Sequence, residues 1–187
     1  VRGLAVDRDG RIVVGGSFTT AGSDEANHIA VWDGRAWLNL GGGLDDEVEV
    51  VAAGPEGYIY AVAAHTDEST GGTQHRVWRW DGTRWATLYT MAFAVNALAA
   101  APNGDLFMGG AFGGAIKRWD GRSWTQPAAG LNAPVHALAV DPEGYLYAAG
   151  EFTASGGTPL AHVARWNGIA WSGLGQGVAG QGNALAI

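Results

Sequence analysis

The sequence contains no cysteine, and proline accounts for only six of its 187 residues. The absence of cysteine excludes disulfides, cysteine-ligated zinc and a thiol nucleophile. No run of 18 apolar residues is present, so the sequence predicts no membrane-spanning helix. Basic residues are also scarce, since eleven of them stand against eighteen acidic residues and the formal net charge is −7. Because the basic residues form no stripe, we expect no nucleic-acid partner.

Glycine and tryptophan, in contrast, are abundant. The chain has 31 glycines and nine tryptophans, and 47% of its residues are apolar while 16% are charged. This composition is sufficient for a hydrophobic core and argues against disorder. The glycines predict many tight turns or close backbone contacts. The tryptophans predict either a repeated packing role or a binding surface.

The chain repeats itself about every 47 residues. An apolar segment followed by a turn opens each repeat, as in "VRGLAVDRDG" and "VHALAVDPEG". The glycines that close these turns lie 47, 47 and 40 residues apart; they are Gly10, Gly57, Gly104 and Gly144. A second motif, W-[DN]-G-x-x-W, occurs once in each repeat. Periods of roughly 20–50 residues are typical of repeat arrays and propellers.

Each repeat predicts four short strands and almost no helix. Segments rich in β-branched and aromatic residues alternate with Gly, Asn and Asp, and no helical periodicity is sustained. Four strands in such a repeat are typical of a propeller blade. We therefore predict an all-β fold, a β-propeller with four four-stranded blades and one extra strand, forming a single domain or a segment of a propeller over 1–187. The expected blades are 1–47, 48–94, 95–134 and 135–181, and the extra strand is 183–187.

The paired residues inside the W-[DN]-G-x-x-W motif favour a two-residue type I′ hairpin turn, in which both residues take a positive φ. The turn residues are Asp33, Gly34, Asp81, Gly82, Asp120, Gly121, Asn167 and Gly168. With such a turn, the two tryptophans of a motif lie on adjacent strands but not directly opposite each other. Their recurrence predicts a place in the structural core, with sugar stacking as the alternative. The core tryptophans are Trp32, Trp37, Trp80, Trp85, Trp119, Trp124, Trp166 and Trp171.

The fourth repeat, over 135–177, shows the whole pattern best. It resembles the repeats of large secreted or cell-surface bacterial propeller proteins, and those in the extracellular region of the fungal cortical-marker protein Rax2. The resemblance covers the whole chain and implies an extracytoplasmic β-propeller that serves as an adhesion or scaffold module. It carries no catalytic residues. The second repeat departs most, because "AVAAH" replaces its G-G-x-F segment, and the third lacks most of one loop.

No catalytic group, cofactor or metal site is predicted, and we expect a protein that is not an enzyme. The "DRDG" turn lacks the further oxygen ligands of a calcium loop, and the histidines do not group as zinc ligands do. His28 and His162 occupy equivalent repeat positions, which predicts a structural hydrogen bond. The acidic run "LDDEVE" over 44–49 is interpreted as a solvated link, with a cation or a basic partner as the alternative.

The loops between the second and third strands of a blade vary most, and loops on a rigid scaffold often carry function. They cover 18–28, 65–75 and 152–162, and we expect them to emerge on one face. The possible ligand or partner contacts in and beside them are Thr19, Asp24, Glu25, Asp67, Glu68, Trp78 and Thr153.

These observations favour a non-catalytic structural or adhesive module of an extracellular or cell-surface protein. It would self-assemble through terminal strands or open blade faces into a ring or filament. Its partners would be copies of itself, other cell-surface proteins or glycans. A carbohydrate-binding, lectin-like propeller is the alternative. The third hypothesis, ranked last, is an enzyme that uses the central channel. The simpler alternative to self-assembly is that the chain is a fragment of a longer propeller or of a multi-propeller chain.

Overall fold

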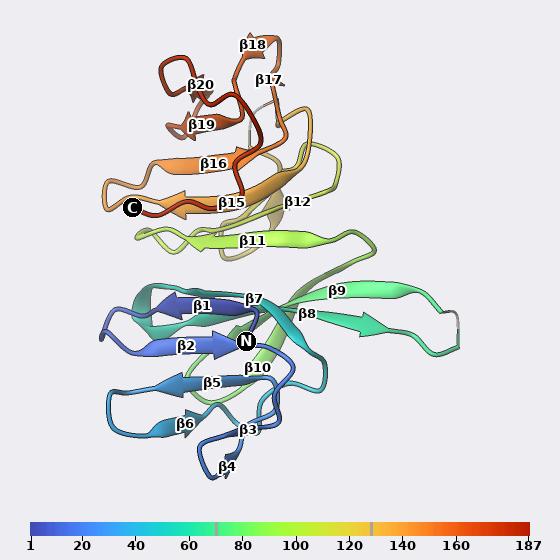
Figure 1. Cartoon of the computed structure of the whole chain (residues 1–187), viewed down its shortest axis with the longest axis vertical. Coiled ribbons are helices and arrows are strands. Elements are labelled where there is room, and N and C mark those ends of the chain that lie inside the picture. The colour runs from blue at the N-terminus through green and yellow to red at the C-terminus, as the bar shows by residue number, and fades with distance from the viewer. Residues whose placement is uncertain (70, 128) are drawn as a thin grey trace. The chain divides into compact units, whose positions relative to one another are not determined.

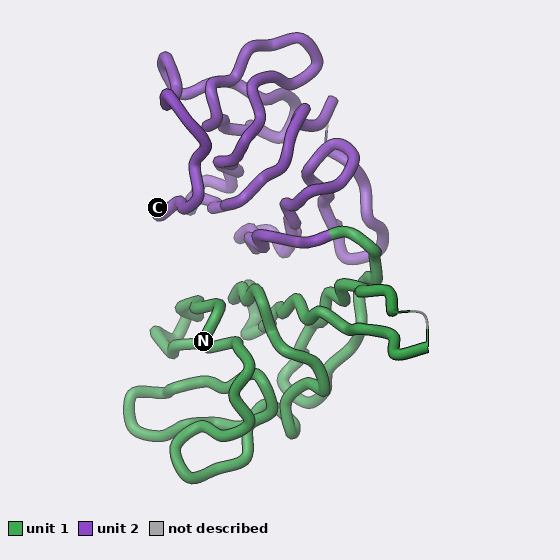
Figure 2. The backbone as a smooth tube through the Cα atoms, turned by 45° about the vertical axis from the view of Figure 1, so that its right-hand side comes forward, with its two compact units in different colours: residues 1–93 green, residues 94–187 purple. Residues whose placement is uncertain are grey.

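The fold is almost entirely β-structure. The computed structural model describes residues 1–69, 71–127 and 129–187. Within these ranges the single helical element is a 3₁₀ turn, η1 (Pro55–Gly57). The chain divides into two units, 1–93 and 94–187, which are green and purple in Figure 2. Each unit contains two four-stranded antiparallel sheets, most of whose strands are labelled in Figure 1.

The first unit contains the first two sheets. Their strands are β1 (Gly3–Val6), β2 (Ile12–Gly15), β5 (Ile29–Trp32) and β6 (Trp37–Asn39), then β7 (Val48–Ala53), β8 (Ile59–Thr66), β9 (Thr73–Trp80) and β10 (Trp85–Met91). A small hairpin, β3 (Thr20–Ala21) with β4 (Asp24–Glu25), occupies the loop between β2 and β5.

The second unit repeats this plan. Its strands are β11 (Val95–Ala100), β12 (Leu106–Gly110), β13 (Ile116–Trp119) and β14 (Trp124–Thr125), then β15 (Val135–Val140), β16 (Leu146–Gly150), β19 (Val163–Trp166) and β20 (Trp171–Gly173). A hairpin of β17 (Ala154–Ser155) and β18 (Thr158–Pro159) matches β3–β4. In all four sheets the strands pair in chain order, as in a propeller blade. The prediction of an all-β fold of four-stranded blades is therefore confirmed.

Neighbouring blades within a unit pack through their first strands, β1 against β7 and β11 against β15. At both interfaces a valine side chain lies directly on a glycine. A Cβ atom added to Gly15 would collide with Val48, and one added to Gly109 would lie 2.6 Å from Cγ1 of Val135. These glycines are needed for close approach rather than for a turn, since neither has a positive φ.

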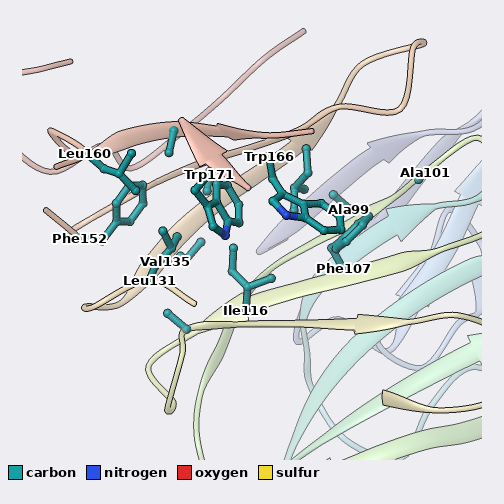
Figure 3. Packing of buried hydrophobic residues seen from close by; sticks show 14 residues of the cluster. Ala99, Ala101, Phe107, Ile116, Leu131, Val135, Phe152, Leu160, Trp166 and Trp171 are labelled. Atoms are coloured by element: carbon teal, nitrogen blue, oxygen red, sulfur yellow. The ribbon is translucent and has the colours of Figure 1, made fainter. Parts of the chain in front are cut away.

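The large side chains fill the space between blades. In the second unit, Phe107 of β12 meets Trp166 of β19 edge to face, with ring centroids 5.7 Å apart (Figure 3). In the first unit, Val13 and Ile29 share a buried cluster with Trp80 of the neighbouring blade. Burying each large apolar side chain contributes roughly 1.5–3 kcal/mol. Three motif tryptophans are buried (Trp80, Trp166 and Trp171), and five are half-buried (Trp32, Trp37, Trp85, Trp119 and Trp124).

The W-[DN]-G-x-x-W turns differ from the type I′ expectation. Trp32 pairs directly with Trp37, so four residues connect the strands, and the other three motifs have the same register. Only the glycine has a positive φ, 95° at Gly34. The side chain of Asp33 forms the turn, because its Oδ1 accepts the backbone N–H groups of Arg35 and Ala36 at 2.8 Å each. This local side-chain bond competes with the two-residue turn.

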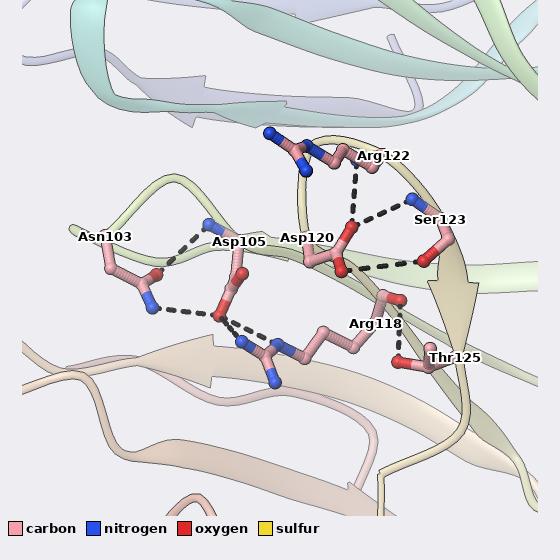
Figure 4. Close-up of polar contacts among 7 residues, drawn as sticks. All are labelled: Asn103, Asp105, Arg118, Asp120, Arg122, Ser123 and Thr125. Carbon is pink, nitrogen blue, oxygen red and sulfur yellow. Dashed lines mark hydrogen bonds and ion pairs between the residues drawn. The ribbon is translucent and has the colours of Figure 1, made fainter.

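The same aspartate turn recurs in the third repeat, where Oδ1 of Asp120 accepts the backbone N–H groups of Arg122 and Ser123 (Figure 4). Because the tryptophans lie directly opposite, their rings meet, with centroids 5.4 to 6.4 Å apart in the four motifs. The expected offset between the two rings of a motif is therefore not found.

The two equivalent histidines hold a left-handed backbone position. His28 and His162 both have φ of 65°, and Ala115 takes the same role in the third blade with φ of 56°. In each case the carbonyl accepts a glycine N–H at or just after the end of the preceding strand, as in the 3.1 Å bond from Gly150 to His162. The His162 ring nitrogen Nδ1 also lies 3.3 Å from the Gly150 carbonyl oxygen. The position is therefore a recurrent bend at the end of the loop.

Residues 183–187, expected as an extra strand, have no regular secondary structure. The residue before them docks on the fourth blade, where Gly182 N donates to the Gly150 oxygen at 3.4 Å. Val48 N donates to the equivalent Gly16 oxygen at 3.3 Å in the first unit. The segment is thus placed like a first strand. Among the described residues, no second strand pairs with this segment, whereas β15 pairs with β16.

Replacing Gly109 with valine tests the blade interface. The added side chain would overlap Val135 and Leu138, so we expect a loss of roughly 1–3 kcal/mol in the free energy of unfolding. Gly113→Val is the matched control, because a Cβ at Gly113 meets no atom within 4 Å. Urea unfolding of both variants measures the difference. Equal destabilisation of the two would contradict the close-packing role.

Acidification tests the aspartate turns. The Thr83 hydroxyl, followed by the backbone N–H groups of Arg84 and Thr83, lowers the pKa of Asp81 to about 2. A pKa lowered by folding stabilises the protein above the unfolded value near 4, and this contribution is lost as the pH falls toward about 2. We therefore expect Asp81→Asn to reduce the loss of stability between about pH 5 and pH 2, measured by urea unfolding.

The fourth repeat supplies the reciprocal control. Asn167 Oδ1 already accepts the backbone N–H groups of Ile169 and Ala170, at 3.0 and 2.9 Å. Asn167→Asp is expected to keep these bonds and to increase acid sensitivity. Unchanged acid sensitivity in both variants would show that the turns do not contribute to it.

Candidate functional site

A cavity of about 810 Å³ lies in the first unit, beside the link that precedes β7 and the far end of the β8–β9 hairpin. Its volume is within the range of small-molecule sites. The lining residues come from both segments, from the start of the chain and from the position directly before β5. They are Arg2, His28, Asp45, Asp46, Glu47, Glu49, Ala64, His65, Thr66, Asp67, Glu68 and Ser69.

The second repeat forms this cavity because its hairpin is longer than the equivalent ones. β8 and β9 remain paired as far as Thr66 and Thr73, so the expected loop 65–75 is strand at both of its ends. The turn beyond them is closed by the bond from Asp67 N to the Gly72 oxygen, 2.9 Å. The extension places histidine and arginine side chains beside the acidic link.

One pair of charged contacts centres on Asp46. Its Oδ1 lies 2.9 Å from Nδ1 of His65, and its Oδ2 lies 3.7 Å from the Arg76 guanidinium. A carboxylate on Nδ1 favours the tautomer in which Nδ1 carries the proton and Nε2 is the basic nitrogen. This pair therefore has the arrangement of a histidine oriented for proton transfer.

A second set of contacts centres on Glu49 of β7. Its Oε2 lies 3.2 Å from Nδ1 of His75, and its Oε1 lies 3.7 Å from Arg2. Arg2 also contacts Glu47 at 2.7 Å. Arg2 and Glu49 occupy the same position in the first and second repeats, so this ion pair connects adjacent blades at the ends of their first strands.

The cavity has a strong excess of negative charge. Six carboxylate side chains line it, against the single guanidinium of Arg2. Such a lining attracts cations and opposes anions. No group of three or more His, Cys, Asp or Glu side chains that could hold a metal ion is found in the described part of the chain.

The structure brings together only some of the residues predicted for binding. Asp67 and Glu68 line the cavity beside the acidic link. Trp78 packs against the buried cluster of the first unit. Thr153 is held by Asn132, whose Oδ1 accepts its backbone N–H at 2.8 Å. The remaining three lie in or beside the β3–β4 hairpin, away from this cavity: Thr19, Asp24 and Glu25.

Sequence reasoning did not select His65, His75 or Arg76 as site residues. A signal was present, because "AVAAH" breaks the repeat pattern at the end of β8. The acidic run over 44–49 breaks it in the link that precedes the same blade. The two departures become neighbours in the folded unit.

Comparison with known proteins identifies the fold class. A family model described as a domain of unknown function (DUF5122) beta-propeller matches residues 8–30. The chain is a β-propeller repeat protein. No curated protein matches it. Among the described residues, no helix has the length and apolar character needed to cross a bilayer.

Two solved structures are similar in fold. A gluconolactonase, XC5397 from Xanthomonas campestris, is 18% identical with a TM-score of 0.62, and the match covers 97% of this chain and 63% of the other. YCF48 bound to a D1 peptide is 14% identical with a TM-score of 0.53, and the match covers 91% of this chain and 51% of the other. The chain thus spans less than two thirds of either neighbour.

The first of these neighbours corrects the prediction that the protein is not an enzyme. That prediction depended on the absence of a recognisable catalytic motif, but a propeller with an enzymatic activity shares this fold. A propeller brings side chains from separate blades together, so a catalytic group need not form a motif in the sequence.

Proposed function

We propose that the chain is a structural or adhesive β-propeller module of an extracellular or cell-surface protein, and that its open blade face binds a further blade. A second copy of the chain can supply that blade and extend the assembly into a ring or filament. The proposal concerns how the module assembles, and it holds equally for a propeller that also carries out a reaction.

The observation that carries this proposal is the exposed apolar face of the first blade. Leu4 and Val6 of β1 are 65% and 68% exposed, and Ile12, which pairs with Val6, is 40% exposed. In the fourth blade the equivalent residues Leu138 and Val140 pack against the buried cluster of the second unit. The same repeat positions are therefore covered where a preceding blade is packed on them.

The chemistry of this face favours another blade as its occupant. Inside each unit, a first strand places its valine on a glycine of the preceding blade, as Val48 does on Gly15. The first blade presents the same kind of strand, and within the described residues of the first unit no blade lies on its outer apolar residues. The extracellular location is supported by the resemblance of the repeats to secreted and cell-surface propellers.

Light scattering across a range of protein concentrations tests the assembly. We expect the parent chain to gain mass with concentration, and Leu4→Lys to remain monomeric, because the lysine places a charge in the apolar contact. Ile169→Lys is the control, since Ile169 is 82% exposed in a hairpin turn. A monomeric parent at all concentrations, or association of Leu4→Lys equal to that of the parent, would contradict self-assembly.

Carbohydrate binding is a second candidate, and one observation favours it. A pocket of about 260 Å³ beside the β3–β4 hairpin is lined by the indole of Trp37 together with Phe18 and Thr20. An indole face beside a hydroxyl group can stack on a sugar ring and bond to it. Trp37 therefore replaces Trp78, which is half-buried against the cluster of the first unit, as the candidate sugar contact.

A glycan array tests this second candidate. Binding by the parent chain that is lost in Trp37→Ala and kept in Ile169→Lys is the expected result. Absence of binding to every glycan on the array would remove the carbohydrate hypothesis.

A further inference from the structure

The cavity of the first unit exposes one of its two histidine–carboxylate pairs to solvent. The His65 side chain is 35% exposed and lines the cavity, whereas the His75 side chain is 12% exposed and does not line it. Asp46, which holds His65, is 18% exposed. The pair thus combines an anchored carboxylate with an accessible imidazole.

The basic nitrogen of His65 is not engaged elsewhere. Its Nδ1 bonds to Asp46 at 2.9 Å, and Nε2 has no protein hydrogen-bond partner among the described residues. A histidine held in this way accepts a proton on Nε2, and the carboxylate stabilises the imidazolium that forms. Because its reference pKa is near neutrality, roughly 6.5, histidine can both take and return a proton.

We propose that this cavity is a general acid–base site in which His65 catalyses hydrolysis of a small neutral or cationic ester. Nε2 takes a proton from a water molecule as the water oxygen bonds to the ester carbonyl carbon. As this bond forms, the carbonyl electron pair moves to the carbonyl oxygen. The pair returns to the carbon as the bond to the alcohol oxygen breaks, and the proton on Nε2 passes to the departing alkoxide. The products are a carboxylic acid and an alcohol, and His65 returns to its neutral form.

The lining of the cavity determines the charge of the substrate. Asp45, Glu47 and Glu68 add negative charge around the Asp46–His65 pair, so an anionic ester is repelled and a neutral or cationic one is accepted. The acid product ionises at neutral pH and is repelled by the same carboxylates. Water is the attacking group in this proposal, because the chain has no cysteine and, among the described residues, no serine is bonded to His65.

The second unit supplies a matched control. His136 Nε2 lies 3.0 Å from Glu151 Oε1, and its side chain is 25% exposed. It is therefore also a histidine–carboxylate pair, but it lies outside the cavity. A nonspecific contribution of surface imidazoles to ester hydrolysis would be seen equally in His65 and His136 variants.

The experiment measures hydrolysis of 4-nitrophenyl acetate, of the anionic 4-nitrophenyl hemisuccinate, and of the cationic ester acetylcholine by the full 187-residue chain. We expect turnover of the neutral and cationic probes above the buffer rate, and a lower rate with the anionic one. His65→Ala should lose about 100-fold in kcat, the scale of general-base catalysis, and His136→Ala should keep the parent rate. Asp46→Asn should lower kcat with little change in KM, because Asp46 positions His65.

Imidazole added to the buffer separates a catalytic from a structural loss. With His65→Ala it should raise the rate above that of the same imidazole buffer without protein, which a collapsed cavity would not permit, and thermal unfolding of the variant should match that of the parent. The proposal is overturned by a parent chain with no turnover above buffer, by equal rates in the His65 and His136 variants, or by a His65→Ala rate in imidazole equal to that of imidazole alone.

Discussion

The close approach of first strands in neighbouring blades is the constraint on which the rest of the structure depends. Val48 lies on Gly15 in the first unit and Val135 lies on Gly109 in the second, so the strands at each interface must carry small residues. Sheets that are this close along one edge diverge toward the other. The aromatic residues of the outer strands, such as Trp80 and Trp166, fill the space that this divergence leaves.

Much of the fold could be predicted because the blade pattern occurs four times in the sequence. The period, the turn glycines and the motif tryptophans were sufficient for the four-stranded sheets. The type of turn was not predictable from the Asp-Gly pair alone, because Oδ1 of Asp33 takes two backbone N–H groups and selects a four-residue connection. The preference of Asp-Gly for type I′ turns concerns backbone angles only. It does not include hydrogen bonds from the aspartate side chain to the backbone of the turn, which here favour a longer connection.

The candidate site could be predicted only in part, because it forms where the repeat is broken. His65 and Asp46 are 19 residues apart in the sequence, and no local spacing relates them. They meet because β8, the second strand of its blade, extends to Thr66 and is eight residues long, whereas the equivalent strand β2 has four residues. The regular blades thus provide a rigid support, and the irregular second repeat places charged groups on it. An acidic run and a lost G-G-x-F segment were the visible signs of this in the sequence.

The contact between a valine of one blade and a glycine of the preceding blade is tested most directly by nuclear Overhauser spectroscopy. The structure predicts cross-peaks between the Val48 methyl protons and the Gly15 α-protons, and between those of Val135 and Gly109. Observation of both would establish the same interface in the two units. Their absence in a folded, assigned spectrum would contradict the packing of blades through their first strands.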